Sequence, residues 1–162
     1  MLLDHDWCAF LKERRVLVGL SYDMLEDLHD GARVDASSRG TNRRVLESMR
    51  LLQKTGVEFN ILCTLTNPIA RHPEKVWRCM EQLDVRFVQF TLCLDALETP
   101  GESQYALTPK RFAGFYNTLF PLWLAAYQKG QYRSVKLFDD VIHRLAFGSY
   151  NMCGLDGQCR AQ

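Results

Sequence analysis

The sequence predicts an α/β fold in which parallel strands form part of a barrel and helices lie outside it. Three apolar segments begin at Val16, Val57 and Val85, and a helical pattern separates each from the next. Single helices between strands are typical of right-handed βαβ units, which build parallel sheets. Three or four strands are too few to close a barrel, and no Gly-rich phosphate loop follows any of them. We therefore expect the middle of a larger α/β barrel.

The first third of the chain predicts one strand and one well-marked helix. The amphipathic segment Trp7–Leu11 leads into the strand Val16–Ser21, and the acidic segment Tyr22–Asp30 follows it. Residues Arg33–Asn42 are charged and polar, which indicates a loop. Thr41 or Asn42 caps the next helix, and a Lys54-Thr55-Gly56 sequence ends it. The apolar face of that helix carries Val45, Met49 and Leu52.

The rest of the chain continues the alternation of strands and helices. Two further strands are expected at Val57–Leu65 and Val85–Leu94, with a helix between them that opens at Pro73. After a long loop, Thr108 caps another helix, in which Pro121 predicts a kink or a break. The last predicted elements are a short strand, Ser134–Phe138, and a helix, Asp139–Phe147.

Composition excludes several classes of protein. The chain has 162 residues, of which 47% are hydrophobic and 24% charged, the balance of a single globular domain. A net charge of +1 gives no reason to expect a nucleic acid as partner. No apolar run approaches the roughly 20 residues that span a bilayer, and the N-terminus lacks the features of a secretory signal. We therefore expect a cytoplasmic protein that binds neither nucleic acid nor membrane.

The six cysteines divide into two groups. Four are scattered among apolar residues, where a free thiol behaves as a small hydrophobic side chain. Cys153 and Cys159 instead lie in a Gly-containing tail, where they are candidate ligands of a metal or an iron–sulfur cluster. Two free thiols, or half of a zinc site, are the alternatives.

Several segments resemble radical S-adenosylmethionine (SAM) enzymes. The strand end Val18–Asp23, followed by Leu28-His29-Asp30 and then Arg33, resembles their Ile-Ser-Leu-Asp-Gly…His-Asp…Arg segment. Within that family the chain is most similar to the anaerobic sulfatase-maturating enzymes, which carry a cluster-binding C-terminal extension, the SPASM domain. Further segments resemble this group in the same order along the chain: Gly56–Leu62, Val85–Leu94, Tyr105–Pro109 and the cysteine tail.

The resemblance covers only the second half of the barrel and the start of the extension. It implies a partial radical SAM core over residues 1–147 and the first part of the SPASM region over residues 148–162. The cysteine triplet that binds the SAM-cleaving cluster is absent, as are the later cluster cysteines and the acidic residue that resembles a catalytic base. No catalytic residue is therefore assigned. Locally, Met24-Leu25 stands where the family has Gly-Pro.

The resemblance implies roles for five residues. Ser21 and Arg33 match positions that bind the SAM carboxylate or ribose, and Leu94 matches a position beside the adenine. Cys153 and Cys159 match the first two ligands of an auxiliary [4Fe–4S] cluster. From the residues alone, a strand-end cap is favoured for Ser21 and a solvated loop position for Arg33, and a buried core position is the alternative for Leu94.

Three other polar residues have open roles. Asn60 and Gln89 interrupt apolar strands, which is consistent with either a substrate-facing barrel lumen or a hydrogen-bonded position in the core. His29 is expected at the surface or in a cap rather than as a titrating group.

The resemblance also implies an activity and its cofactors. In that family a reduced [4Fe–4S] cluster cleaves SAM to a 5′-deoxyadenosyl radical. The radical abstracts hydrogen from the Cβ of a Cys or Ser in a sulfatase polypeptide, which becomes formylglycine. We expect a fragment of such an oxidoreductase, inactive by itself. Another peptide-modifying enzyme of the SPASM group, or a remnant with a structural role, is the alternative.

Overall fold

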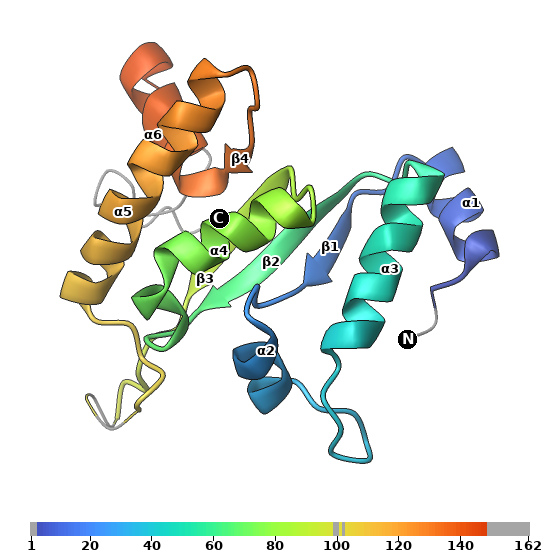
Figure 1. The fold of residues 1–162 in the computed structure, drawn as a ribbon, viewed down its shortest axis with the longest axis horizontal. Helices are drawn as coiled ribbons and strands as arrows, with labels where there is room; N and C mark the ends of the chain where they lie inside the picture. The colour runs from blue at the N-terminus through green and yellow to red at the C-terminus, as the bar shows by residue number, and fades with distance from the viewer. Residues whose placement is uncertain (1–2, 99–100, 102, 149–162) are drawn as a thin grey trace.

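The computed structural model describes residues 3–98, 101 and 103–148, and its elements alternate between helix and strand (Figure 1). In chain order the elements are α1 (His5–Glu13), β1 (Val18–Ser21), α2 (Glu26–Ala32), α3 (Asn42–Thr55), β2 (Phe59–Leu65), the short 3-10 helix η1 (Ile69–Arg71), α4 (Pro73–Gln82), β3 (Phe87–Leu92), α5 (Pro109–Gln128), β4 (Ser134–Val135) and α6 (Lys136–Phe147).

The four strands form one parallel sheet in the order β1-β2-β3-β4. The predicted α/β class and the parallel order of the strands are confirmed. Strands β1 and β4 are the edges, so the sheet is open, as expected for part of a barrel. Strand β4 has only two residues, because α6 begins at Lys136 within the segment predicted as strand.

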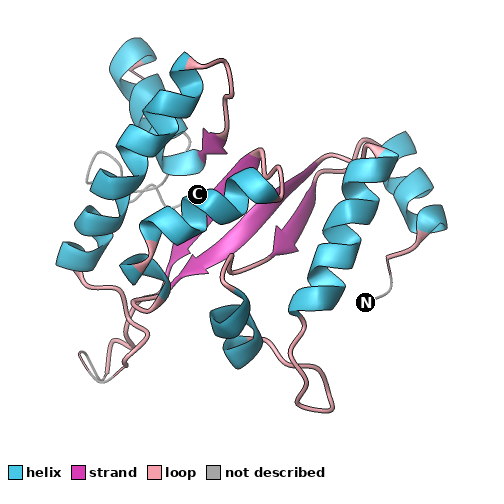
Figure 2. Ribbon diagram, in the orientation of Figure 1, coloured by secondary structure: helices cyan, strands magenta, loops and turns pink. Residues whose placement is uncertain are grey.

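One face of the sheet forms the hydrophobic core. The register places Leu20, Ile61, Val88 and Val135 side by side in a row that crosses all four strands. All four side chains are buried. In the view of Figure 2, α4 lies in front of the sheet and α3 lies beside β1. Met49, Leu52, Val76 and Met80 complete the core from these two helices.

The opposite face of the sheet carries most of its polar side chains. Because side chains alternate along a strand, the residues between the core positions point away from these helices. Ser21, Leu62 and Gln89 form one row on this face, and Asn60 and Thr64 are also on it. These side chains are exposed or half-buried. Asn60 and Gln89 therefore lie on the face that would line a barrel lumen rather than in the core described above.

Local sequence signals explain most helix ends. Asp4 caps α1 by accepting a hydrogen bond from the backbone N–H of Trp7, and Thr108 caps α5 through the N–H of Arg111. Gly56 ends α3 with a φ of 68°, a left-handed conformation that glycine adopts at little cost. Of the kink or break expected at Pro121, a break is not found, because α5 continues through this residue to Gln128.

Helix α2 lies in the acidic segment after β1, which had not been predicted as helical. The chain turns into it at Met24, which has a φ of 65°. A non-glycine residue in this left-handed region is strained by about 1–2 kcal/mol. The Met24 side chain is nevertheless 2% exposed and belongs to the core cluster. Its burial offsets the strain, which explains how methionine occupies a position where the resembled family has glycine.

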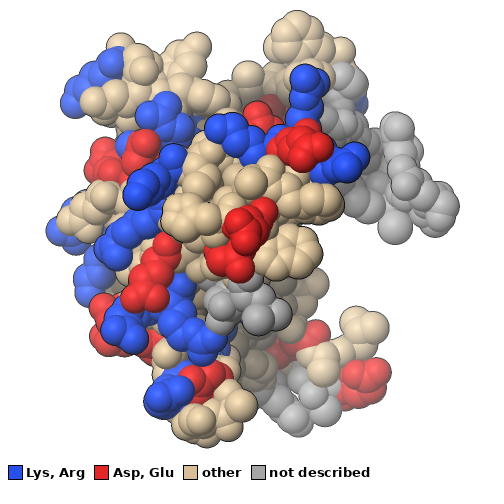
Figure 3. Space-filling model, turned by 90° about the vertical axis from the view of Figure 1, so that its right-hand side faces the viewer, with Lys and Arg blue, Asp and Glu red and all other residues tan. Residues whose placement is uncertain are grey.

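Charged side chains of both signs cover the side of the molecule that carries α1 and α3 (Figure 3). Arg43 and Glu47 form an exposed ion pair one turn apart on α3, and Arg39 pairs with Asp35 in the loop before it. Within the described ranges, no helix combines the length and apolar character needed to cross a bilayer.

Replacing Met24 by glycine or alanine should separate strain from packing. Either change removes a buried side chain, which costs about 2–5 kcal/mol. Only glycine also relieves the strained φ, so Met24→Gly should be more stable than Met24→Ala by about 1 kcal/mol. Urea denaturation of the two variants and the wild type measures these differences. If Met24→Ala is the more stable variant, the left-handed conformation is not retained.

Candidate functional site

The carboxyl ends of β1 and β2 hold a buried carboxylate and an arginine. Asp23 lies two residues beyond the end of β1 and is 4% exposed, and Arg33 follows α2. Arg33 Nε donates to Asp23 Oδ2 at 2.6 Å, and its Nη2 lies 3.3 Å from Asp23 Oδ1 and 3.4 Å from Thr64 Oγ1. The backbone N–H of Thr64, in β2, donates to Asp23 Oδ1 at 3.1 Å. The Asp23 carboxylate thus connects β1, β2 and the segment after α2.

These contacts keep Asp23 ionised. Burial alone raises the pKa of this carboxyl, but the hydrogen bonds from the Arg33 guanidinium and the Thr64 backbone N–H lower it below its ordinary value. The hydrogen bond to Asp23 raises the pKa of Arg33 in turn. The pair carries fixed opposite charges at the end of the sheet where α/β enzymes build their sites.

His29 is completely buried, so the expected surface position is wrong. Its Nδ1 lies 3.2 Å from the backbone N of Asp23, and its Nε2 lies 3.2 Å from Thr41 Oγ1. The hydroxyl of Thr41 donates to the carbonyl oxygen of Arg33 at 2.9 Å. His29 therefore joins the turn after β1 to the loop before α3.

The structure brings all three predicted SAM-binding residues to the carboxyl end of the parallel sheet. Ser21 is the exposed last residue of β1, two residues before Asp23. Arg33 is about one-third exposed at its side chain while it contacts Asp23. Leu94 lies two residues beyond the end of β3 and is 72% exposed, so it is not a core residue. Whether these three bind SAM stays a prediction.

The predicted cluster ligands Cys153 and Cys159 lie outside the described residues. Helix α6 ends at Phe147, where the boundary between the two predicted regions was placed. The four cysteines in the described part of the chain are free thiols, and burial raises the pKa of Cys63 well above its usual value. Residues 3–98, 101 and 103–148 contain no group of three or more His, Cys, Asp or Glu side chains that could hold a metal ion.

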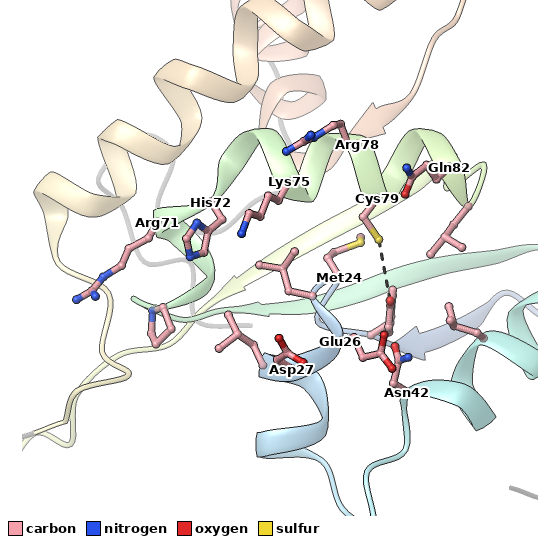
Figure 4. Close-up of a pocket in the computed structure, with 16 residues that line it drawn as sticks. Met24, Glu26, Asp27, Asn42, Arg71, His72, Lys75, Arg78, Cys79 and Gln82 are labelled. Atoms are coloured by element: carbon pink, nitrogen blue, oxygen red, sulfur yellow. Dashed lines mark hydrogen bonds between the residues drawn. The ribbon is translucent and has the colours of Figure 1, made fainter.

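A pocket of about 680 Å³ lies among α2, α3 and α4 on the helix-covered side of the sheet (Figure 4). Arg71, Lys75 and Arg78 line one wall, and Glu26 and Asp27 come from α2 opposite them. Ser21, Arg33 and Leu94 do not line this pocket.

The pocket also contains a thiol and a phenol that contact each other. The hydroxyl of Tyr22 lies 4.0 Å from Cys79 Sγ, and burial raises the pKa of both groups. Neither is therefore prepared as an ionised nucleophile. We place the candidate site at the strand ends and not in this pocket.

Sequence reasoning missed the partners of Arg33. Asp23 is part of the motif that resembles radical SAM enzymes but received no role of its own, and neither Thr41 nor Thr64 was considered for the site. Asp23 could have been found, because a carboxylate shortly after a buried strand lies at the end of the sheet that binds ligands. No local pattern indicates that Thr64 faces it, because that contact depends on the register between β1 and β2.

The chain is similar in sequence to anaerobic sulfatase-maturating enzymes, although no protein-family model matches it. Cysteine-type anaerobic sulfatase-maturating enzymes from Clostridium novyi and Clostridium perfringens are 34% and 37% identical to the chain, and each alignment covers 99% of it. A serine-type enzyme from Bacteroides thetaiotaomicron is 21% identical over 98% of the chain. The chain spans 43% and 44% of the two clostridial enzymes, which is less than half of their length.

A solved structure of a sulfatase-maturating enzyme has the same fold as this chain. The structure of native anSMEcpe with bound AdoMet and Cp18Cys peptide matches 98% of the chain with a TM-score of 0.91 and 36% sequence identity. The match takes in 44% of that protein. The fold predicted as part of a radical SAM barrel is confirmed by this likeness.

Substitution of Asp23 should show how much the ion pair stabilises the fold. The pKa of Asp23 falls from an ordinary 3.8 to about 2, which corresponds to about 2 kcal/mol of stability. Because the folded-state pKa is depressed, this contribution is fully present well above pH 3.8 and is lost as the pH falls through about 2. Asp23→Asn should therefore be less stable than the wild type by about 2 kcal/mol at pH 7.

Urea denaturation of both proteins between pH 2 and pH 7 measures the difference. It should be constant above about pH 5 and shrink between pH 4 and pH 2. Asp27→Asn is the control, because Asp27 is an exposed residue of α2. A difference that is the same at pH 2 and pH 7 would show that the Asp23 charge does not stabilise the fold.

Proposed function

We propose, from the homology of this chain to the anaerobic sulfatase-maturating enzymes, that it supplies the second half of a radical SAM barrel. The substrate would be a cysteine of a sulfatase polypeptide, which the complete enzyme would oxidise to formylglycine. The identity of 34–37% over 99% of the chain is the observation that carries this proposal. The cysteine-type relatives are more similar to the chain than the serine-type enzyme at 21%, which favours a cysteine substrate.

Arg33 has the geometry to bind the carboxylate of SAM. Asp23 occupies the Nε edge of its guanidinium, and about a third of the side chain remains exposed. A guanidinium offers five N–H donors in a fixed plane, so it can hold one carboxylate and still donate to another. The low pKa of Asp23 keeps this orientation over the physiological pH range. Ser21, exposed at the end of β1, adds a hydroxyl at the same end of the sheet.

The chain would contribute binding and orientation, while bound SAM and its cluster would supply the radical chemistry. Arg33 and Ser21 would bind the carboxylate or ribose of SAM, and Leu94 would lie beside its adenine. The polar face with Asn60 and Gln89 would line the barrel, where it could contact a peptide. A solved neighbour holds AdoMet and a peptide together, which supports such an arrangement.

Iron–sulfur clusters are a further part of the proposal. Cys153 and Cys159 would be two ligands of an auxiliary [4Fe–4S] cluster, which normally takes four thiolates. The other four cysteines are each separated from the next by at least 14 positions, so they do not form the close triplet of a SAM-cleaving cluster. Such reducing chemistry is consistent with a cytoplasmic location.

The role of Arg33 is tested best in a completed protein, in which this chain replaces the corresponding segment of the Clostridium perfringens enzyme. Arg33→Lys removes the forked geometry and keeps the charge, so SAM should bind about tenfold more weakly. Equilibrium dialysis under anaerobic conditions measures the dissociation constant. Arg39→Lys is the control, because Arg39 is exposed and pairs with Asp35 in the loop. Equal SAM affinity in both variants would remove Arg33 from the site.

The cysteines give a second test. The 162-residue chain by itself should form no 5′-deoxyadenosine after anaerobic reconstitution with iron and sulfide, because it lacks the ligands of the SAM-cleaving cluster. In the completed protein, Cys153→Ala and Cys159→Ala should each lower the iron content, and Cys79→Ala should not. Iron analysis and chromatography of the reaction products provide the measurements. Unchanged iron in both tail variants would mean that these cysteines are not ligands.

A further inference from the structure

We propose that His29 and Thr41 are positioning residues for Arg33. Three hydrogen bonds connect the backbone of Asp23 to the backbone of Arg33 through these two side chains. The Asp23 carboxylate then returns to the Arg33 guanidinium and closes a ring of four residues. The functional consequence of this ring rests on the proposed binding of SAM by Arg33, but the ring itself does not.

The direction of each hydrogen bond follows from the backbone amide of Asp23. An amide N–H can only donate, so Nδ1 of His29, at 3.2 Å, accepts. The imidazole is then neutral, with its proton on Nε2, and that N–H donates to Thr41 Oγ1. The Thr41 hydroxyl uses its own proton to donate to the Arg33 carbonyl oxygen. Each donor in this series faces an acceptor only when the His29 imidazole is neutral.

A second contact of Nδ1 competes with this arrangement. Asp23 Oδ2 lies 3.5 Å from Nδ1 and would pair with it if His29 were protonated. The amide contact is shorter, and its hydrogen is fixed by the backbone, whereas the carboxylate already accepts from Arg33 and Thr64. We therefore assign the neutral imidazole to this structure.

The ring holds Arg33 at both ends. Its carbonyl oxygen accepts from the Thr41 hydroxyl at 2.9 Å and from the Thr41 backbone N–H at 3.2 Å, and its guanidinium contacts Asp23. His29 is 0% exposed and packs against the Tyr22 ring at 5.2 Å, so it is a rigid spacer between the two ends. An arginine side chain has many rotamers, and ordering it before binding lowers the entropic cost of capturing a ligand.

Two variants at Thr41 isolate the hydroxyl. Thr41→Val keeps the shape and removes the hydrogen bonds to His29 and the Arg33 carbonyl, whereas Thr41→Ser keeps the hydroxyl. The readout is solvent exchange of the Arg33 Nε–H, followed by ¹⁵N NMR on the 162-residue chain and on the completed protein. We expect about tenfold faster exchange in Thr41→Val, the factor that one lost hydrogen bond represents, and little change in Thr41→Ser. Equal rates in both variants would overturn the proposal.

A variant of His29 tests the same connection without changing the packing at Thr41. The side-chain carbonyl of His29→Asn can still accept from the Asp23 amide, but this shorter side chain does not reach Thr41. It should therefore accelerate Arg33 Nε–H exchange as Thr41→Val does. Wild-type exchange in His29→Asn would also overturn the proposal, because the connection through the imidazole would then be dispensable.

SAM affinity in the completed protein separates this proposal from the proposed function. If Arg33 binds SAM, Thr41→Val should raise the dissociation constant for SAM about tenfold. The reaction rate at saturating SAM should stay nearly unchanged. If exchange accelerates and SAM affinity stays the same, Arg33 is positioned by the ring but does not bind SAM. In that case the assignment of Arg33 under the proposed function fails and the positioning role stands.

Discussion

The Asp23 carboxylate is the contact on which the site geometry depends. It accepts hydrogen bonds from the Arg33 side chain and from the backbone of β2 at Thr64, and its own residue ends the turn after β1. A carboxylate buried without partners would be costly, so this position requires that the two strands and the loop be in place together. The register of β1 on β2 thus determines where Arg33 points, and the core row of Leu20 and Ile61 fixes that register.

Much of the fold followed from local signals in the sequence. The apolar runs and the capping residues Pro73, Thr108 and Gly56 give the order of strands and helices and most of their ends. Helix α2 was not predicted because Leu28 and Ala32 are its only apolar side chains, and two are too few to show a helical period. Helix α5 continues across Pro121, and the rings of Phe120 and Trp123 on either side of this proline both contact Phe138 of α6.

The site was harder to predict than the fold. Arg33 and Ser21 were found through a resemblance and not through their own chemistry, and the position after a strand supported only Ser21. His29 was expected at the surface or in a cap because Asp30 is adjacent to it, yet the folded chain buries it completely between Asp23 and Thr41. Those partners lie 6 and 12 positions away and come together only when the loop before α3 folds back. No local pattern contains that information.

The two edges of the sheet differ in what they offer another strand. Strand β1 has four residues and β4 only two, and unpaired backbone groups along an edge can form a ladder with a neighbour. A strand from any source would gain more hydrogen bonds beside β1 than beside β4. Addition of a strand is therefore favoured at the β1 edge. A strand added there would lie beside Ser21, the last residue of β1.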